Sequence, residues 1–205
     1  MGALDTLRTD GLALARGGRI VLRGLSVTVR AGEALAVEGR NGAGKTSLLR
    51  AIAGFLEPQS GSIQLSFRDG AAVASGEERG RFVGWLGHQD GTKPQFTPRE
   101  HLQFAQRFYG RADDSTNALN RSGLARLGDV PAQYLSAGQK RRLALARLLA
   151  CARPLWLLDE PFAALDNEGK TIVRDLVAEH CARGGIAVAA THEPLGISCR
   201  TLQLA

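Results

Sequence analysis

The sequence predicts an α/β fold with a mainly parallel sheet, an antiparallel β subdomain at the N-terminus and an inserted α-helical subdomain. Three observations support this prediction. Over much of the chain, short apolar runs alternate with stretches of helical periodicity, as in a doubly wound parallel sheet. Residues 5–30 instead alternate loosely between apolar and polar side chains around Gly17-Gly18, which is typical of antiparallel strands. Residues 90–135 carry turn residues and helical spacing in place of strand-like runs.

Length and composition indicate a globular protein without membrane spans. The chain of 205 residues suits one domain with a sizeable core, or one domain with a small insert. No apolar stretch approaches the ~18 residues that a membrane helix needs, and the N-terminus has no apolar signal core. The 3 cysteines are far apart, which favours reduced cytosolic thiols over a disulfide framework. The net charge of +6 permits contact with nucleic acid, anionic lipid or an acidic partner and selects none of them.

The strands expected in the first 90 residues are short apolar runs separated by turns. Between them, a helix is expected over Ser47–Phe55, where Leu48, Leu49 and Ile52 have helical spacing. The segment 69–80 is rich in Gly, Ala, Ser and Glu without a period, and it is predicted to be a surface loop. The predicted strands cover residues 20–22, 25–29, 34–37, 63–67 and 82–86.

The remainder of the chain is predicted to contain helices and two further strands. Ser136 can cap one of the helices through its hydroxyl. The uniformly apolar run 155–158 predicts a strand that is covered on both faces. The predicted helices cover residues 99–109, 115–127, 136–150 and 168–181, and the second strand covers residues 186–190. We therefore expect a single domain over 1–205, with a core at about 1–90 and 148–205 and a helical subdomain at about 91–147.

A phosphate-binding loop is predicted between the strand at 34–37 and the helix that follows it. Residues 38–47 have the sequence EGRNGAGKTS, and Gly39, Gly44, Lys45 and Thr46 fit the pattern G-x-x-x-x-G-K-[ST]. The glycines allow a tight turn whose backbone N–H groups face an anion, and the helix N-terminus adds its positive dipole end. Lys45 supplies a cation for the β- and γ-phosphates, and Thr46 offers a hydroxyl to Mg²⁺. The other loop residues expected to contact the nucleotide are Arg40, Asn41, Gly42, Ala43 and Ser47.

Polar groups follow four of the predicted strands directly. The phosphate-binding loop follows one, and Gln89, Asp159-Glu160 and His192 follow the other three. Because ligands of open α/β sheets bind beyond the carboxyl ends of the strands, we expect these groups to share one site. Asp159 is predicted to be the second Mg²⁺ anchor, and Glu160 to hold the attacking water and accept its proton.

Two of these assignments have structural alternatives. Asp159-Glu160-Pro161 is about equally compatible with a helix N-cap followed by an acid in the first turn. A single histidine such as His192 is more often structural than catalytic. The phosphate-binding loop upstream favours the functional interpretation, in which His192 bonds to the γ-phosphate or orders Glu160.

The segment L135-S136-A137-G138-Q139 resembles the signature motif of ATP-binding-cassette (ABC) ATPases. With the phosphate-binding loop, Gln89, Asp159-Glu160, the stretch FAALD at 162–166 and His192, the resemblance covers nearly the whole chain in the family's order. The resemblance implies a P-loop NTPase (RecA-like) core that binds and hydrolyses ATP with Mg²⁺. It further implies a head-to-tail homodimer, in which two ATP molecules lie between the P-loop of one copy and the signature of the other.

The resemblance assigns roles to individual residues. Ser136, Gly138 and Gln139 would contact the nucleotide of the partner copy, because the start of a helix offers a ready anion site. Gln89 would sense Mg²⁺ and the attacking water and link them to the helical subdomain. Asp166 would lie at the dimer interface.

The chain departs from the family pattern at two positions. Ala137 replaces the commoner glycine of the signature, a small change that should leave Ser136 and Gly138 working. The family usually stacks an aromatic side chain on adenine about two dozen residues before the P-loop, and Arg16 stands at the matching place. A planar guanidinium can stack on a base, although a solvated surface arginine is nearly as compatible with the sequence.

The short length, G87-H88-Q89 and the LSAGQ form of the signature resemble the haem-exporter ATPases of cytochrome c maturation. This resemblance implies integral membrane permease subunits as partners and a position on the cytoplasmic face of the inner membrane. The alternatives are a soluble ABC ATPase acting on nucleic acid or ribosomes, an ABC subunit exporting another substrate, and a regulatory protein with an inactive cassette. The single P-loop and the absence of heptads argue against the soluble class, so no direct nucleic-acid contact is expected. The intact site residues argue against the inactive cassette.

A set of large apolar side chains lies close to Gln89 in the sequence. These residues are Phe96, Leu102, Phe104, Phe108 and Tyr109. They are about equally compatible with two arrangements: a core of the helical subdomain itself, or an exposed patch. The family resemblance implies that a cytoplasmic coupling helix of a membrane subunit docks in this region.

Overall fold

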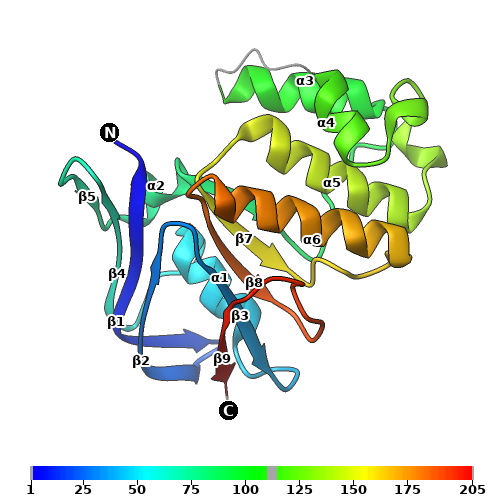
Figure 1. The fold of residues 1–205 in the computed structure, drawn as a ribbon. Helices are drawn as coiled ribbons and strands as arrows, with labels where there is room; N and C mark the ends of the chain where they lie inside the picture. Colours follow the sequence, from blue (N-terminus) through cyan, green and yellow to red (C-terminus); the bar gives the residue numbers. More distant parts are fainter. Residues whose placement is uncertain (1, 110–114, 205) are drawn as a thin grey trace.

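The computed structural model describes residues 2–109 and 115–204 and arranges them as two sheets with surrounding helices (Figure 1). The first sheet is antiparallel, with the strand order β2-β1-β4-β5, and the second is parallel, with the order β6-β7-β8-β3-β9. The strands are β1 (Leu4–Arg16), β2 (Arg19–Arg30), β3 (Ala34–Gly39), β4 (Ser60–Phe67), β5 (Ala72–Val73), β6 (Val83–Leu86), β7 (Leu155–Asp159), β8 (Ile186–Ala190) and β9 (Arg200–Leu204). The predicted combination of a parallel sheet and an N-terminal antiparallel subdomain is confirmed.

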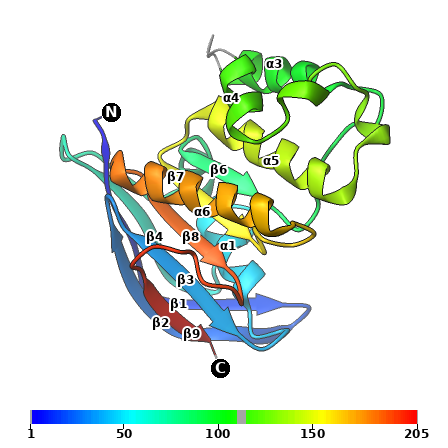
Figure 2. The same ribbon diagram turned by 45° about the vertical axis from the view of Figure 1, so that its right-hand side comes forward.

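The helices are α1 (Lys45–Ala53), α2 (Gly76–Gly80), α3 (Pro98–Phe108), α4 (Ser115–Arg121), α5 (Ala137–Cys151) and α6 (Asn167–Ala182), with short 3-10 turns η1 (Ala125–Leu127) and η2 (Ala132–Tyr134). Helix α1 lies between the two sheets, α5 and α6 cover the outer face of the parallel sheet, and α3 and α4 lie beyond α5 (Figures 1 and 2). Within residues 2–109 and 115–204, no helix combines the length and apolar character that crossing a membrane requires.

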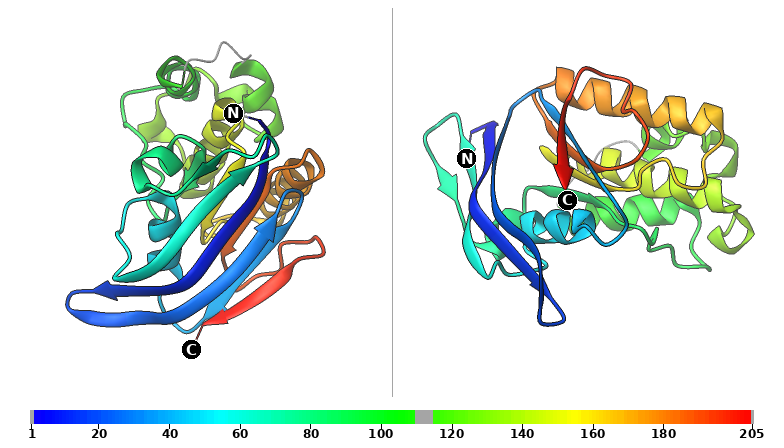
Figure 3. Two further views of the ribbon diagram at one scale, coloured as in Figure 1. Left: turned by 90° about the vertical axis from the view of Figure 1, so that its left-hand side faces the viewer. Right: turned by 90° about the horizontal axis from the view of Figure 1, so that it is seen from below.

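The antiparallel sheet is built on β1, which pairs with β2 on one side and β4 on the other. These strands form a long curved ribbon at one side of the molecule (Figure 3). The sequence predicts two strands where β2 is continuous. Register shifts in its pairing with β1 accommodate Gly24, whose φ of 63° lies in the left-handed region, so the strand passes through the predicted break.

The parallel sheet is covered on both faces, which explains its uninterrupted apolar runs. Successive residues of β7 point to opposite faces. Leu155 and Leu157 belong to the cluster around α1 and the antiparallel sheet, whereas Trp156 and Leu158 belong to the cluster under α5 and α6. All residues of β7 and β8 are buried. The sheet thus holds its strand ends, and the residues that follow them, in fixed positions.

The helical subdomain has its own small core, in which Leu102 is fully buried together with residues of α4 and α5. Helix α5 contributes Leu143 and Ala146 to this core, and it contributes Leu145 and Leu148 to the core under the parallel sheet. A single helix therefore joins the subdomain to the sheet across the predicted boundary at 147. The division into core and subdomain stays a prediction.

Three segments differ from the predictions. The predicted loop 69–80 contains β5 and α2, because buried Arg79 donates hydrogen bonds to backbone carbonyls of α1 and β4 and holds the segment against them. The helix predicted over 115–127 ends as α4 at residue 121, where Gly123 adopts a φ of 71°. The sequence analysis predicts no strand near the C-terminus, yet β9 pairs in parallel with β3 as an edge strand.

The cysteines agree with the expectation of reduced thiols. Cys151 and Cys181 are buried, Cys199 is partly buried, and no disulfide joins them. Burial raises the pKa of Cys181 to about 11, so its side chain is a thiol and not a reactive thiolate at neutral pH.

Candidate functional site

The phosphate-binding loop runs from the end of β3 into α1, as predicted. Gly39 has a φ of 149°, and a Cβ there would lie 2.6 Å from the Leu204 carbonyl oxygen of β9, so only glycine fits. Gly44 caps α1 with a φ of 98°. The backbone of the loop therefore leaves the first turn of α1 open toward the carboxyl edge of the sheet, where its N–H groups can bind an anion.

Lys45 and Thr46, the first residues of α1, reach toward groups from other strand ends. Lys45 is buried, and its Nζ donates to the Gly39 carbonyl and lies 3.1 Å from His192 Nε2. The Thr46 hydroxyl donates to Asp159 at 3.0 Å to Oδ1 and 3.1 Å to Oδ2. The ends of β3, β7 and β8 thus converge on one place, which confirms that these groups are neighbours.

A pocket of about 350 Å³ surrounds this point. Arg16, at the end of β1, lies in its wall beside the loop residues. Of the residues that follow the predicted strands, Gln89 and His192 do not line this pocket, and His88, which precedes Gln89, lines it instead. The full lining consists of Arg16, Val21, Arg40, Asn41, Gly42, Gly44, Lys45, Thr46, Ser47, His88, Asp159 and Glu160.

The oxygen donors in this pocket fit Mg²⁺ in the company of phosphates. Mg²⁺ in phosphate-transferring sites usually takes one or two protein oxygens, and phosphate and water complete its octahedron. Thr46 and Asp159 offer a hydroxyl and a 4% exposed carboxylate side by side. Among the described residues no group of three or more His, Cys, Asp or Glu could hold a metal by itself. The donor set therefore suits a metal that arrives with its nucleotide.

Glu160 has an unusual backbone for a residue with a Cβ. Its φ of 49° lies in the left-handed region, and its N–H donates to the Ala190 carbonyl of β8 at 2.9 Å. This turn directs the Glu160 carboxylate into the pocket, with Oε1 3.7 Å from His192 Nε2. Asp159-Glu160 therefore does not cap a helix, which removes the structural alternative for this pair.

The signature-like segment forms the start of α5 and lines a cavity separate from the P-loop pocket. Ser136 caps the helix: its Oγ accepts the Gln139 N–H, while Gln139 Oε1 accepts the Ser136 N–H. A Cβ on Gly138 would lie 2.8 Å from the Ala164 carbonyl, so glycine is required for this packing. Ser136, Gly138 and Gln139 line a cavity of about 470 Å³ and none of them lines the pocket of the P-loop.

Asp166 lies beside the same cavity. Its carboxylate accepts the Gly169 N–H and caps α6, and it pairs with Arg142 at 2.7 Å. The bond from the Gly169 N–H contributes most to holding the pKa of Asp166 below its ordinary value, and the bond from Arg142 adds to this effect. The carboxylate is therefore charged at neutral pH.

Arg141 does not line the pocket but bonds to the backbone of residues around it, a role that the sequence does not indicate. Its guanidinium is 2% exposed and donates to the backbone carbonyls of Gly87, Asp159 and Glu160, each at 2.6 Å. It also pairs with the Asp90 carboxylate at 2.9 Å. In the sequence Arg141 is one of three consecutive basic residues. Only its spacing relative to the buried residues of α5 distinguishes it from the other two.

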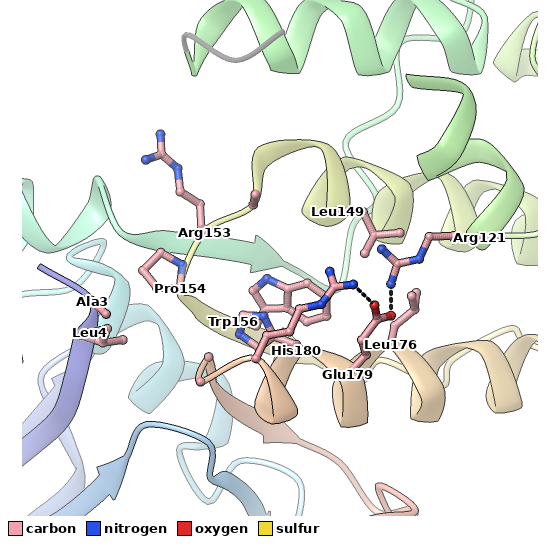
Figure 4. Close-up of a pocket in the computed structure, with 14 residues that line it drawn as sticks. Ala3, Leu4, Arg121, Leu149, Arg153, Pro154, Trp156, Leu176, Glu179 and His180 are labelled. Carbon is pink, nitrogen blue, oxygen red and sulfur yellow. Dashed lines mark hydrogen bonds and ion pairs between the residues drawn. The ribbon is translucent and has the colours of Figure 1, made fainter. Parts of the chain in front are cut away.

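A third cavity, of about 290 Å³, lies at the amino ends of β7 and β8 (Figure 4). Glu179 bridges Arg121 and Arg183 there, which neutralises part of the basic charge. Trp156 and His180 stack with ring centroids 4.0 Å apart, and burial lowers the pKa of His180 to about 4. The imidazole is therefore neutral at physiological pH. None of the predicted site residues lines this cavity.

Comparison with known proteins places the chain in a family. Residues 22–163 match the family model for ABC transporters. A protein of Rhodopseudomonas palustris (strain BisB5), named "Cytochrome c biogenesis ATP-binding export protein CcmA", is 47% identical over 195 residues, which is 95% of each chain. A protein of the same name from Hyphomonas neptunium is 44% identical over 93% of this chain and 91% of its own.

Solved structures agree with this assignment. The structure of an ATP-binding subunit of an ABC transporter superposes with a TM-score of 0.78 at 26% identity, covering 91% of this chain and 79% of that one. The family-model match over residues 22–163 includes the P-loop, Gln89, the signature-like segment and Asp159-Glu160. This chain belongs to the ABC transporter family and is an ATP-binding-cassette ATPase.

Proposed function

We propose that this protein hydrolyses Mg·ATP to drive a membrane complex that serves cytochrome c biogenesis, in which haem or a haem-bound chaperone is handled by the membrane subunits. The observation that carries the ATPase part is the convergence of Lys45, Thr46, Asp159 and Glu160 on one pocket. The identity of 47% to a cytochrome c biogenesis export protein supports the cellular role. An ABC subunit for another substrate would carry the same pocket, so the role is tested in cells, as described below.

The proposed chemistry divides between phosphate, metal and water. Lys45 and the loop N–H groups bind the phosphates, and Thr46 with Asp159 hold Mg²⁺. Bound Mg²⁺ would neutralise charge on the β- and γ-phosphates. Glu160 orients the attacking water and takes its proton, with His192 within 3.7 Å of its carboxylate.

Gln89 is proposed to join this set from the loop after β6. Its exposed side chain lies next to His88, which is already in the pocket wall. We infer that a movement of this loop brings the Gln89 side chain into the pocket.

We infer a head-to-tail homodimer from the separation of the two cavities. The start of α5 offers the Ser136 hydroxyl and the N–H groups of a helix N-terminus, which suit an anion. The P-loop of the same copy opens into a different pocket, which supports an arrangement in which a second copy brings its nucleotide to this helix.

Arg16 is proposed to stack its guanidinium on the adenine ring. It lies in the pocket wall and is exposed, at the end of β1 beside the P-loop. Arg16→Ala is expected to weaken ATP binding about two- to fivefold, because such stacking contributes roughly 0.5–1 kcal/mol at an exposed site. Arg16→Tyr should restore the affinity through its aromatic face. Equal Kd values for the wild type and Arg16→Ala in calorimetry would rule out the stacking.

A groove beside the helical subdomain is proposed to bind the membrane subunit. Phe104 and Phe108, 57% and 74% exposed, lie over α3, and both line a mainly apolar cavity of about 440 Å³. Leu102 from the same predicted set is core, so only part of that set forms the exposed patch. An amphipathic helix from an integral partner fits such a groove. This contact would bring the protein to the cytoplasmic face of the inner membrane.

Phe104→Glu is expected to reduce membrane recruitment at least severalfold while leaving ATP affinity unchanged, because the charge must be desolvated in the docked groove. Gln103→Glu is the matched control, since Gln103 is exposed on the same helix but does not line the groove. Recruitment is measured by membrane fractionation in cells that express the integral partners. If the wild type stays in the soluble fraction, and cells lacking it still mature c-type cytochromes, the proposed role is wrong.

A further inference from the structure

The guanidinium of Arg141 joins three parts of the molecule that meet at the site. It extends from α5 and is almost completely buried. One nitrogen donates to Gly87 and Asp90 in the loop after β6, and the other donates to the carbonyls of Asp159 and Glu160 at the end of β7. A single side chain therefore fixes the helical subdomain, the Gln89 loop and the proposed catalytic carboxylate relative to one another.

The contact with Glu160 bears on the direction of its carboxylate. A residue with a Cβ in the left-handed region is held there by its surroundings. For Glu160 those surroundings include three hydrogen bonds: its N–H donates to Ala190 at 2.9 Å, and its carbonyl accepts from Arg141 at 2.6 Å and from the Ala163 N–H at 3.2 Å. Loss of the Arg141 bond would leave the Glu160 carbonyl with the longer bond from Ala163 alone, so the backbone that sets the direction of the carboxylate would be held less firmly.

The contacts with the loop reach the apolar groove. Arg147, two turns along α5, donates to the carbonyls of Asp90 and Gly91. Arg147 and Gly91 both line the groove of Phe104. A contiguous set of contacts thus runs from the groove through the loop to Arg141 and on to Glu160 (Figure 2 shows α5 lying between α3 and the parallel sheet).

We propose that Arg141 is a positioning residue for ATP hydrolysis: it holds Glu160 in its productive orientation and transmits movements of the loop after β6 to that residue. This proposal rests on the proposed function of Glu160. Arg141 itself does not line the nucleotide pocket, so it acts through the backbone of Glu160 and not on the nucleotide.

A purely structural role is the competing explanation, because loss of any buried arginine leaves unsatisfied carbonyls. Arg79 provides a matched control. It is 3% exposed and donates to the backbone carbonyls of Ala51, Ile52, Ile63 and Ala74, yet it lies outside the nucleotide pocket. Arg79→Met should therefore reproduce the loss of stability without the loss of positioning.

The test compares steady-state hydrolysis and ATP binding for Arg141→Met, Arg79→Met, Glu160→Gln and the Arg141→Met/Glu160→Gln double variant, each in its membrane complex. Arg141→Met is expected to lower kcat about tenfold or more, since small misplacements of a catalytic group have effects of this size, and to leave KM for ATP within about twofold. Arg79→Met should lower the melting temperature similarly and keep kcat. In the double variant, Arg141→Met should cause no further loss, because the carboxylate that it positions is already gone.

Three results would overturn the proposal. In the first, Arg141→Met and Arg79→Met have equal kcat values while Glu160→Gln is inactive. This result would refute only the role of Arg141. The second is a multiplied loss in the double variant, which would show that Arg141 acts independently of Glu160. The third is full turnover by Glu160→Gln alone, which would refute the proposed role of Glu160 itself, and this proposal with it. If Arg141→Met does not fold, Arg141→Lys replaces it, with a severalfold lower kcat expected because an ammonium cannot reach all four acceptors.

Discussion

Glu160→Gln is expected to lower ATP hydrolysis about 100-fold or more while leaving ATP binding within about twofold of the wild type. General-base catalysis contributes factors of this size, and an amide cannot accept the proton of the attacking water. Lys45 and Thr46, which bind phosphate and metal in our proposal, form hydrogen bonds with Gly39 and Asp159, and these bonds do not depend on the Glu160 side chain. The ATP-bound dimer should accumulate, because hydrolysis is the step that ends it. Gel filtration with and without ATP measures this accumulation.

Glu193→Gln is the matched control for this substitution. Glu193 is a second carboxylate near His192, it pairs with Lys170 at 2.8 Å, and it does not line the nucleotide pocket. We expect Glu193→Gln to hydrolyse ATP at the rate of the wild type. Unchanged hydrolysis by Glu160→Gln, measured with the membrane partners present, would mean that another group activates the water.

Lys45→Ala and Asp159→Ala are expected to weaken Mg·ATP binding about 10- to 100-fold each. Each substitution removes a charged partner of a phosphate or of the metal, and hydrogen bonds to charged groups contribute roughly 1.5–3 kcal/mol. The two variants should differ when Mg²⁺ is removed with EDTA. The defect of Asp159→Ala should then largely disappear, whereas the defect of Lys45→Ala should persist, because only Asp159 acts through the metal.

Arg50→Ala is the control for the loss of a cation from α1. Arg50 is exposed on the same helix and lies outside the pocket, so its replacement should leave the Kd of ATP unchanged. Tight Mg·ATP binding by both Lys45→Ala and Asp159→Ala in calorimetry would place the nucleotide elsewhere on the molecule.

The parts of the fold that the sequence predicts well are those with strong local signals. The run at 155–158 is apolar at every position because both faces of β7 are covered, and that pattern predicts a buried strand without any knowledge of its neighbours. The glycines and Lys45 of the phosphate-binding loop likewise indicate their function directly, because few other functions need that spacing. Strand β9 gives no comparable signal. It is an edge strand with exposed Arg200 and Thr201, and its pairing with β3 fixes it.

Long-range contacts also determine the structure of the segments for which the sequence-based predictions are wrong. Nothing local distinguishes residues 69–80 from a polar loop, and the segment is held by Arg79 reaching to α1 and β4. Among the large apolar residues of the helical subdomain, the sequence leaves open which are core and which are exposed. Packing of α3 against α4 and α5 buries Leu102 and leaves Phe104 and Phe108 at the surface.

The sequence by itself determined the chemistry of this protein: a P-loop, the acidic pair Asp159-Glu160 at a strand end, and a signature-like segment that caps a helix. These features are local, since each depends on a few adjacent residues and on the element that carries them. The tertiary structure alone decided which of these groups share a pocket, that Arg16 lies in its wall, and that Gln89 does not. It also assigned Arg141 its place between the Gln89 loop and Glu160, because its four acceptors lie 18 to 54 residues away in the sequence. Contacts over such distances are set by the packing of whole elements, which no local pattern of side chains records.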